Sequence, residues 1–267
     1  MSGYIAPRSV DLVWFTGPDA VRFLNDLISQ EIGKLEPRQV RRSLLLGPQG
    51  KLDHILWALR GDDLVGLVTA EGRGEELAAT LNRYRIRVKV DIEVEDRPRW
   101  VVVGEATSGA WSGDRGDPVE ADISWRSTPR TLVVGERPDL PDGSLEDYEL
   151  ARILDGEPEW GVDVDEGTIP QEAGLVEAGV DFTKGCYLGQ ELVARIDSRG
   201  RVVKRLRILD LDGPAAPGSE VTVDGKPVGT LTSVADKVGL ATLRFEVGVG
   251  DQVAVAGTTA VARDPTD

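Results

Sequence analysis

The sequence KGCYLGQELVAR, residues 184–195, places the only cysteine of the chain among glycines and charged side chains. Apolar residues in and just after this stretch repeat at the spacing of one helical face: Leu188, Leu192 and Ile196. We therefore expect a helix that begins near Tyr187, with Cys186 at or just before its N-terminus. Free amide N–H groups and the positive end of the helix dipole stabilise a thiolate at such a position. The stretch predicts a reactive thiol.

The close neighbours of Cys186 favour a functional role for it. Gly185 and Gly189 flank the cysteine where the backbone needs unusual dihedral angles or a close approach to a ligand. Gln190 and Glu191 add polar groups that a core segment does not need. The alternative interpretation is that the cysteine is a small buried hydrophobic residue.

Two cations in the stretch, Lys184 and Arg195, extend this interpretation. Either side chain would stabilise the thiolate of Cys186 if the fold brings it close. For each cation taken alone, a solvated helix face is the alternative to contact with an anion.

The composition restricts the chemistry available to the chain. Its 267 residues, 40% hydrophobic and 29% charged, suffice for one large domain or two small ones. The 46 acidic residues against 31 basic ones give a net charge of −15, so we expect no direct contact with nucleic acid or an anionic membrane. A single cysteine excludes an intramolecular disulfide, and any catalytic histidine within the chain must be His54. With no apolar run of membrane-spanning length and no leader-like start, we expect a cytoplasmic protein.

Hydrophobic periodicity in the first half of the chain alternates between helix and strand signals. A helix is expected after Gly17-Pro18-Asp19, where apolar residues from Ala20 to Ile28 follow helical spacing. Short apolar runs separated by turn residues predict antiparallel strands over residues 42–47, 52–60 and 64–69. A helix over 73–84 and an alternating strand over 85–95 follow. This order indicates an α+β sandwich.

The second half of the chain carries clearer end signals. Residues 104–120 lack periodicity and predict a loop, and a strand is expected near Leu132–Val134. Ser144 and Gly156 predict the start and end of a helix over 145–154. Asp224-Gly225 predicts a tight hairpin. Together with the apolar segments that follow, this hairpin indicates a small all-β module, expected to be a barrel.

The run K-G-C-Y-x-G-Q-E-x-x-x-R at Lys184–Arg195 resembles the signature of the YgfZ-type folate-binding proteins. These are relatives of the glycine-cleavage T-protein, an aminomethyltransferase. The resemblance extends over most of the chain through Gly17-Pro18-Asp19-Ala20 with Phe23-Leu24, Leu44-Leu45-Leu46 with Gly47 to Lys51, Ile169-Pro170-Gln171-Glu172, and Arg199-Gly200-Arg201-Val202. It implies an α+β fold of the T-protein type. In that fold two interleaved α+β lobes, here residues 1–205, form a ring with a small C-terminal β-barrel, here residues 206–267.

The same resemblance implies a function. The expected cofactor is tetrahydrofolate or a one-carbon derivative of it. The expected role is assembly or repair of iron–sulfur cluster enzymes, which would be the protein's clients, with a link to tRNA modification in bacteria through one such enzyme. Cys186 is the expected functional thiol, with Lys184 beside it. A monomer is expected.

Folate chemistry nominates particular side chains. A pterin presents an N–H and an amino group side by side, which the carboxylate of Glu172 can accept as a pair. The anionic tail of folate requires a cation, for which Arg195, Arg199 and Arg201 compete. The resemblance adds further cofactor-binding candidates, so that the set comprises Glu172, Gln171, Tyr187, Gln190, Glu191 and Arg195.

One departure from the T-protein leaves the activity open. T-proteins carry an Asp-Asp pair on the strand after a glycine-rich turn, and a carboxylate there assists aminomethyl transfer. The corresponding stretch here offers only Asp53 and His54, so the pair is not intact. One alternative function is therefore a folate-dependent aminomethyltransferase or demethylase that uses Asp53 or His54. Another is a binding module for a different ligand with apolar and anionic parts.

Overall fold

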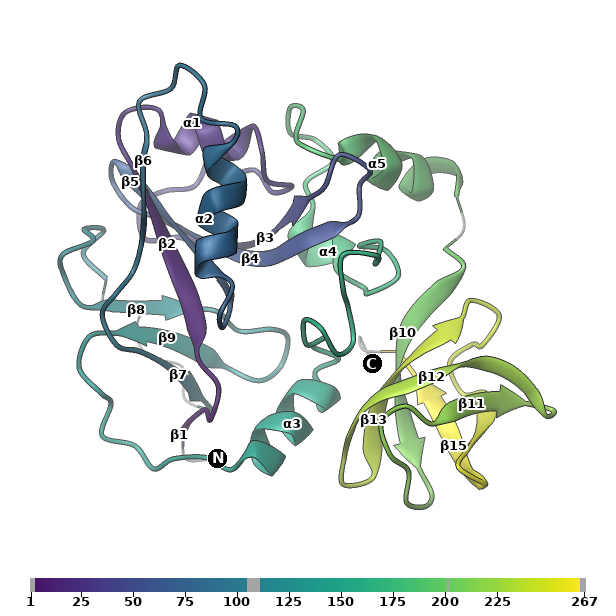
Figure 1. Cartoon of the computed structure of the whole chain (residues 1–267). Helices are drawn as coiled ribbons and strands as arrows, with labels where there is room; N and C mark the ends of the chain where they lie inside the picture. The colour runs from purple at the N-terminus through teal and green to yellow at the C-terminus, as the bar shows by residue number, and fades with distance from the viewer. Residues whose placement is uncertain (1–2, 105–110, 201, 265–267) are drawn as a thin grey trace. The chain divides into compact units, whose positions relative to one another are not determined.

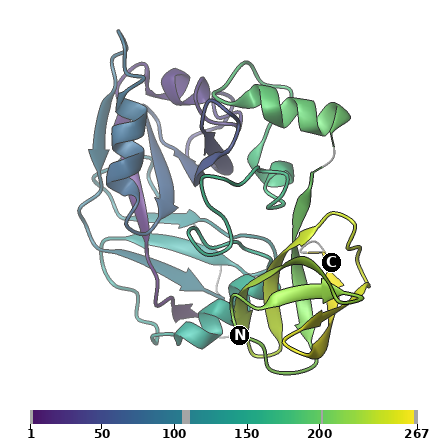
Figure 2. The same cartoon turned by 45° about the vertical axis from the view of Figure 1, so that its right-hand side comes forward.

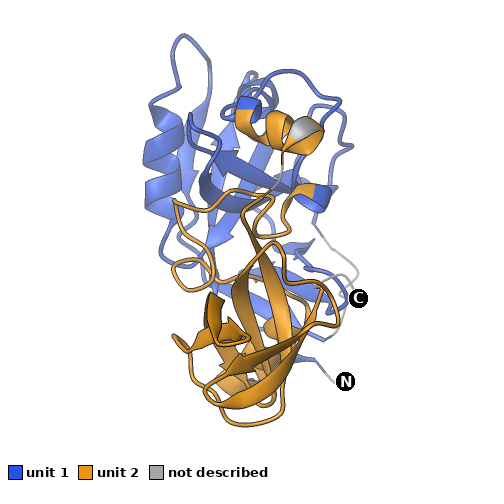
Figure 3. Ribbon diagram, turned by 90° about the vertical axis from the view of Figure 1, so that its right-hand side faces the viewer, with its two compact units in different colours: residues 1–143, 177–191 blue, residues 144–176, 192–267 orange. Residues whose placement is uncertain are grey.

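A computed structural model describes residues 3–104, 111–200 and 202–264 (Figure 1). The chain divides into two compact units, each formed by two separate stretches of sequence (Figure 3). Unit 1 comprises residues 1–143 and 177–191, and unit 2 comprises residues 144–176 and 192–267. Most of the stretch around Cys186 therefore belongs to unit 1.

Unit 1 is built on two antiparallel sheets. The larger sheet has the strand order β3-β4-β5-β2-β6, with bounds β2 (Val10–Thr16), β3 (Val40–Leu46), β4 (Leu52–Arg60), β5 (Leu64–Ala70) and β6 (Asp91–Val94). The smaller sheet has the order β1-β7-β9-β8, with bounds β1 (Tyr4–Ile5), β7 (Arg99–Val103), β8 (Val119–Asp122) and β9 (Arg130–Val134). The strands expected over residues 42–47, 52–60 and 64–69 and near Leu132–Val134 are confirmed.

Two helices of unit 1 cover the larger sheet. Helix α1 (Ala20–Asn25) and helix α2 (Gly74–Asn82) lie where the sequence predicts helices, and α2 runs along the sheet beside β2 and β5 (Figures 1 and 2). Leu77 and Leu81 of α2 join Val13 and Phe15 of β2 in one buried apolar cluster. Their spacing of four residues places both leucines on one helical face, which explains why this face is buried.

The strand expected over residues 85–95 is much shorter in the structure. Only Asp91–Val94 forms strand β6, which pairs with β2. Arg87 has a φ of 58°, a left-handed conformation that interrupts an extended strand, and Ile86 is 73% exposed. The alternation of apolar and charged residues therefore covers a longer segment than the strand itself, because only Asp91–Val94 pairs with a neighbouring strand.

Unit 2 contains helix α3 (Leu145–Leu154) and a closed barrel. The barrel order is β10-β13-β12-β11-β14-β15, with bounds β10 (Lys204–Leu211), β11 (Glu220–Val223), β12 (Lys226–Ala235), β13 (Val238–Arg244), β14 (Gln252–Val255) and β15 (Thr258–Arg263). The predicted hairpin is confirmed, because Asp224 and Gly225 have φ angles of 50° and 74° and join β11 to β12. The predicted cap is also confirmed: Ser144 Oγ accepts the Asp147 N–H at 3.0 Å.

Two further helices include the residues at which the chain changes from one unit to the other, 176–177 and 191–192. They are α4 (Val176–Gly179) and α5 (Gln190–Arg199). Within the described ranges, no helix is both long enough and apolar enough to span a bilayer. Of the loop expected over residues 104–120, residues 105–110 lie outside the described part of the chain.

Candidate functional site

Cys186 lies in an exposed loop of unit 1 and not at a helix end. Helix α5 begins at Gln190, four residues after the cysteine, so the helix start expected near Tyr187 is wrong. The influence of a helix dipole is confined to the first turn, and it therefore does not explain a special thiol here. The thiol is free and exposed, which excludes the buried alternative.

Lys184 is the main anchor of this loop. Its ammonium group donates hydrogen bonds to three backbone carbonyl oxygens, those of Asn25 at 2.5 Å, Ile28 at 2.7 Å and Gln30 at 3.0 Å. Burial lowers the pKa of Lys184 to about 8, against the opposing effect of nearby carboxylates. The side chain thus ties the loop to the turn that follows helix α1. Its role in the structure is to position the loop.

Tyr187 and Gly189, which follow Cys186 in the chain, fix the other side of the loop. Tyr187 is buried, and burial raises its pKa to about 12. Gly189 has a φ of 76°, and a Cβ atom at this position would lie 2.5 Å from the carbonyl oxygen of Gly47. The close approach expected at Gly189 is therefore present. At Gly185 it is absent, because a Cβ atom there would meet nothing within 4 Å.

The chain before Lys184 is fixed by Ser29. Its hydroxyl donates to the carbonyl oxygen of Gly179 at 2.5 Å, and its own carbonyl oxygen accepts the N–H of Asp181 at 3.0 Å. Gln30 adds a bond from its side-chain amide to the carbonyl oxygen of Ala178 at 3.2 Å. Because the loop is held on both sides, Cys186 is displayed to solvent on a fixed backbone.

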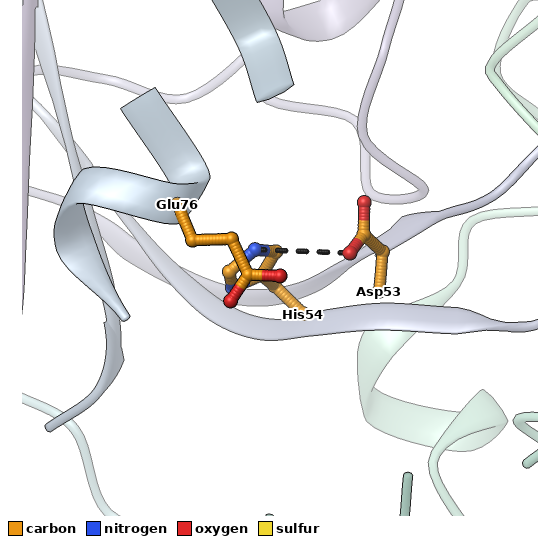
Figure 4. Close-up of side chains that lie close together, drawn as sticks. All are labelled: Asp53, His54 and Glu76. Carbon is orange, nitrogen blue, oxygen red and sulfur yellow. Dashed lines mark ion pairs between the residues drawn. The ribbon is translucent and has the colours of Figure 1, made fainter. Parts of the chain in front are cut away.

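The second candidate group centres on strand β4. Leu46 and Leu45 of β3 pair with Leu52 and His54, so Asp53 is the extra residue of a β-bulge. In a regular strand, adjacent side chains point to opposite faces. The bulge instead brings an Asp53 carboxylate oxygen to 3.8 Å from His54 Nε2 (Figure 4).

The environments of these two groups differ. His54 is fully buried, its Nδ1 lies 3.0 Å from the Thr69 hydroxyl, and burial together with the charge of Arg73 lowers its pKa to about 3. Burial raises the pKa of Asp53, opposed by Arg73. Glu76 of α2 approaches the pair (Figure 4). Arg73 binds the Glu76 carboxylate at 2.9 Å. Glu76 and Thr69 were not predicted from the sequence, because nothing in the pattern of either segment links it to His54.

The remaining folate-binding candidates divide between the units. Tyr187, Gln190 and Glu191 belong to unit 1, where Gln190 Oε1 accepts the Tyr187 N–H at 3.2 Å. Gln171, Glu172 and Arg195 belong to unit 2, and Arg195 is exposed. Of the other predicted cations, Arg201 and the side chain of Arg199 lie outside the described residues.

Glu172 lines a hollow of about 360 Å³ in unit 2, together with Val162, Lys204 and Leu206. Beside it in sequence, the Gln171 side-chain amide donates to the carbonyl oxygen of Val193 at 2.9 Å. Among the described residues, no group hydrogen-bonds the buried Oε1 atom of Gln171. Unit 2 therefore places the carboxylate of Glu172 at a hollow. The neighbouring residue in sequence, Gln171, contributes a buried hydrogen-bond acceptor.

Comparison with known proteins agrees with this architecture. The crystal structure of glycine cleavage system aminomethyltransferase T from Bartonella henselae matches with a TM-score of 0.81, covering 98% of this chain and 85% of that one at 15% identity. Residues 204–266 match the family model of the CAF17 C-terminal beta-barrel domain. The fold is thus of the T-protein type with a small C-terminal barrel, as the sequence predicts.

Closer relatives define the family. The mitochondrial iron–sulfur cluster assembly factor IBA57 of Mus musculus is 33% identical over 88% of this chain and 75% of its own length. The human protein is 34% identical over 86% of this chain and 74% of its own length. The chain belongs to this IBA57 family. The expectation of a cytoplasmic location is wrong, because these relatives are mitochondrial proteins.

Proposed function

We propose that this protein supports the maturation of iron–sulfur enzymes, its clients, with Cys186 as the functional thiol. Its IBA57 relatives carry the name of iron–sulfur cluster assembly factors. The observation that carries the proposal is the contrast between an exposed sulfur and an anchored backbone. Cys186 is solvent-accessible, whereas Lys184 before it and Tyr187 after it are held by unit 1.

Such a loop suits a thiol that must meet another protein. Sulfur on a fixed backbone reaches a partner without the entropic cost of ordering the loop at that moment. One cysteine cannot hold a cluster alone, because iron–sulfur clusters are bound by several cysteine thiolates. The remaining ligands would have to come from a client.

We further propose that the protein binds tetrahydrofolate or a one-carbon derivative of it. Glu172 would accept the paired N–H groups of the pterin, and the buried Oε1 of Gln171 offers an acceptor without a partner among the described residues. Arg195 would meet the anionic tail. Tyr187, Gln190 and Glu191 complete the proposed set of binding residues.

The resemblance of residues 184–195 to the YgfZ signature supports several more specific proposals. We propose a YgfZ-type role, with a link to tRNA modification through one cluster enzyme among the clients. Residues 1–205 would form the folate-binding region and residues 206–267 the barrel. The protein would act as a monomer, without direct contact to nucleic acid or membrane.

Replacement of the thiol tests the principal proposal. Cells that lack their own IBA57-family protein receive the wild-type chain, Cys186→Ser, or the control Gly185→Ala, whose new methyl group meets open space. Activity of a cluster-dependent enzyme is measured in extracts, with protein abundance checked by blotting. We expect rescue by the wild type and the control but not by Cys186→Ser. Full rescue by Cys186→Ser would refute a functional thiol.

A thermal shift with tetrahydrofolate tests the cofactor. Ligand at ~100 times its dissociation constant stabilises the native state by ~2.7 kcal/mol, which raises the melting temperature of a chain of this size by several degrees. Glu172→Gln should reduce the shift. Glu177→Gln, an exposed glutamate on α4, should leave it unchanged. The absence of any shift at millimolar ligand would contradict folate binding.

A second candidate function is a folate-dependent aminomethyltransferase or demethylase that uses Asp53 or His54. The observation that favours it is the bulge, which brings a carboxyl group of raised pKa close to the histidine ring. Turnover of N-methyl or glycine-derived substrates, lost in Asp53→Asn, would support it. No turnover across such a panel would argue against it.

A further inference from the structure

We propose that Asp53, His54 and Glu76 form a binding site for a divalent transition-metal ion, with Zn²⁺ as the best match (Figure 4). The three side chains come from two elements, strand β4 and helix α2. One potential ligand atom from each lies within 4.8 Å of the others. This site is independent of Cys186 and of the proposed folate-binding residues.

The backbone of β4 creates the site. Asp53 is the extra residue of the bulge between Leu52 and His54, and without the bulge its carboxylate would point to the opposite face from the imidazole. Bulges often re-aim a side chain next to a functional site. Here the result is a carboxylate oxygen 3.8 Å from His54 Nε2.

The imidazole is oriented as metal ligands usually are. In protein metal sites the second ring nitrogen of a histidine ligand is held by an outer hydrogen bond, which fixes the ring. His54 Nδ1 lies 3.0 Å from the Thr69 hydroxyl on the neighbouring strand β5. This contact directs Nε2 towards Asp53 and Glu76.

The distances allow closure around an ion. Ligand atoms about 2.0–2.2 Å from a tetrahedral Zn²⁺ lie roughly 3.4 Å from one another. Contraction from the present spacing requires movement of the carboxylates, which are more exposed than the imidazole. The Glu76 side chain is 55% exposed and that of Asp53 is 28% exposed, whereas the imidazole is buried. Three protein ligands and one water would complete the coordination.

Arg73 supports the carboxylates and limits the affinity. Its guanidinium binds Oε2 of Glu76 at 2.9 Å and donates to the carbonyl oxygen of Asp53 at 3.0 Å. Both bonds leave Oε1 of Glu76 available to a cation. The positive charges of Arg73 and Arg83 both act on Asp53, so they offset much of the charge of the two carboxylates. Binding of a divalent ion therefore rests on direct coordination by the three ligand atoms.

Zinc titration of the chelator-treated full chain tests the site. Binding is measured by competition with a fluorescent chelator, and the Cys186→Ser protein is used throughout so that the exposed thiol is not a ligand. We expect one Zn²⁺ per chain and no competition from Mg²⁺, because one imidazole ligand favours zinc. Glu76→Gln, Asp53→Asn and His54→Asn should each weaken binding at least ~10-fold, and Thr69→Val about 10-fold.

The matched control is Glu75→Gln, which alters the exposed glutamate next to Glu76 in the same helical turn and should leave the affinity unchanged. Circular dichroism checks that each variant is folded. Because His54 is buried and its replacement could unfold the chain, the decision rests on the two carboxylate variants. The proposal is overturned if Cys186→Ser binds no Zn²⁺, or if Glu76→Gln and Asp53→Asn bind it as tightly as Glu75→Gln.

Discussion

Two cations, the half-buried Lys184 in unit 1 and the buried Arg152 in unit 2, are stabilised in opposite ways. Lys184 donates to three backbone carbonyl oxygens, and burial lowers its pKa. Arg152 contacts the carboxylates of Asp163, Glu149 and Glu159 at 2.8, 2.6 and 3.3 Å. Burial acts against its charge, but these carboxylates outweigh that effect and raise the pKa of Arg152.

The two kinds of surroundings suit different roles for the two cations. Carbonyl oxygens fix the position of an ammonium group but bring no full negative charge, so Lys184 serves the geometry of the loop that displays Cys186. The carboxylates around Arg152 connect α3 to the segment before the barrel, and its bond to Ser233 at 2.7 Å reaches strand β12. Arg152 therefore contributes to the stability of the whole of unit 2.

The largest effect is expected for Arg152→Met. Removal of the guanidinium leaves Asp163, whose side chain is fully buried, without its cation, and the loss of one partner of a buried ion pair costs about 3–5 kcal/mol. Chemical denaturation should show this loss of unfolding free energy. Arg263→Met, which breaks a more exposed pair with Asp210 at 2.7 Å, should cost less than about 1 kcal/mol. Equal losses of unfolding free energy for the two variants would contradict a special contribution of the buried Arg152 to stability.

Gly189→Ala should have the next largest effect. The new methyl group would collide with the carbonyl oxygen of Gly47 at a left-handed φ of 76°, for a cost of about 2–4 kcal/mol. The matched variant Gly185→Ala meets open space at an ordinary φ and should change stability by less than about 1 kcal/mol. Thermal unfolding of both proteins measures the difference. A large loss for Gly185→Ala would contradict our description of the loop.

Lys184→Met should act more locally. Loss of the hydrogen bonds to three partly buried carbonyl oxygens costs about 1–3 kcal/mol. We expect faster amide hydrogen exchange over residues 181–188 and faster alkylation of Cys186. Lys226→Met, at an exposed lysine of β12 in unit 2, is the control and should change neither rate. Unchanged exchange in Lys184→Met would show that Lys184 is not the anchor of the loop.

The sequence predicts those parts of the site that depend on neighbouring residues. The stretch around Cys186 was found because its glycines and polar residues are adjacent in sequence. The helix start near Tyr187 was wrong for a physical reason: Leu188 fits helical spacing, but it packs into the core of unit 1 while Gly189 adopts a left-handed φ. Because of the left-handed φ of Gly189, the helix begins only at Gln190, four residues after Cys186.

Contacts between distant segments could not be predicted in the same way. Asp53 and His54 were identified, but the bulge that turns both towards Glu76 depends on the pairing of β4 with β3. Pairing register is a property of two strands and leaves no mark in one of them. The anchoring of Lys184 is similar, since its carbonyl partners lie more than 150 residues earlier in the chain.

The pH dependence of stability gives the smallest and most specific test of the comparison. With its pKa lowered from 10.5 to about 8, Lys184 loses its proton in the folded chain before it does so in the unfolded chain. Between pH 8 and pH 10 the unfolded state therefore binds more protons, and the unfolding free energy should rise with pH. Above pH 10 Tyr187 acts in the opposite direction, because its pKa is raised in the folded chain.

Lys184→Met provides the reference for this measurement, since it lacks the titrating group and shares all others. Urea denaturation of both proteins at pH 8, 9 and 10 should show the wild type gaining stability relative to the variant. If the wild type loses stability instead, the carbonyl oxygens hold the proton on Lys184 more strongly than burial releases it. Lys184 would then behave as Arg152 does, and the contrast between carbonyl and carboxylate surroundings would not explain their pKa values.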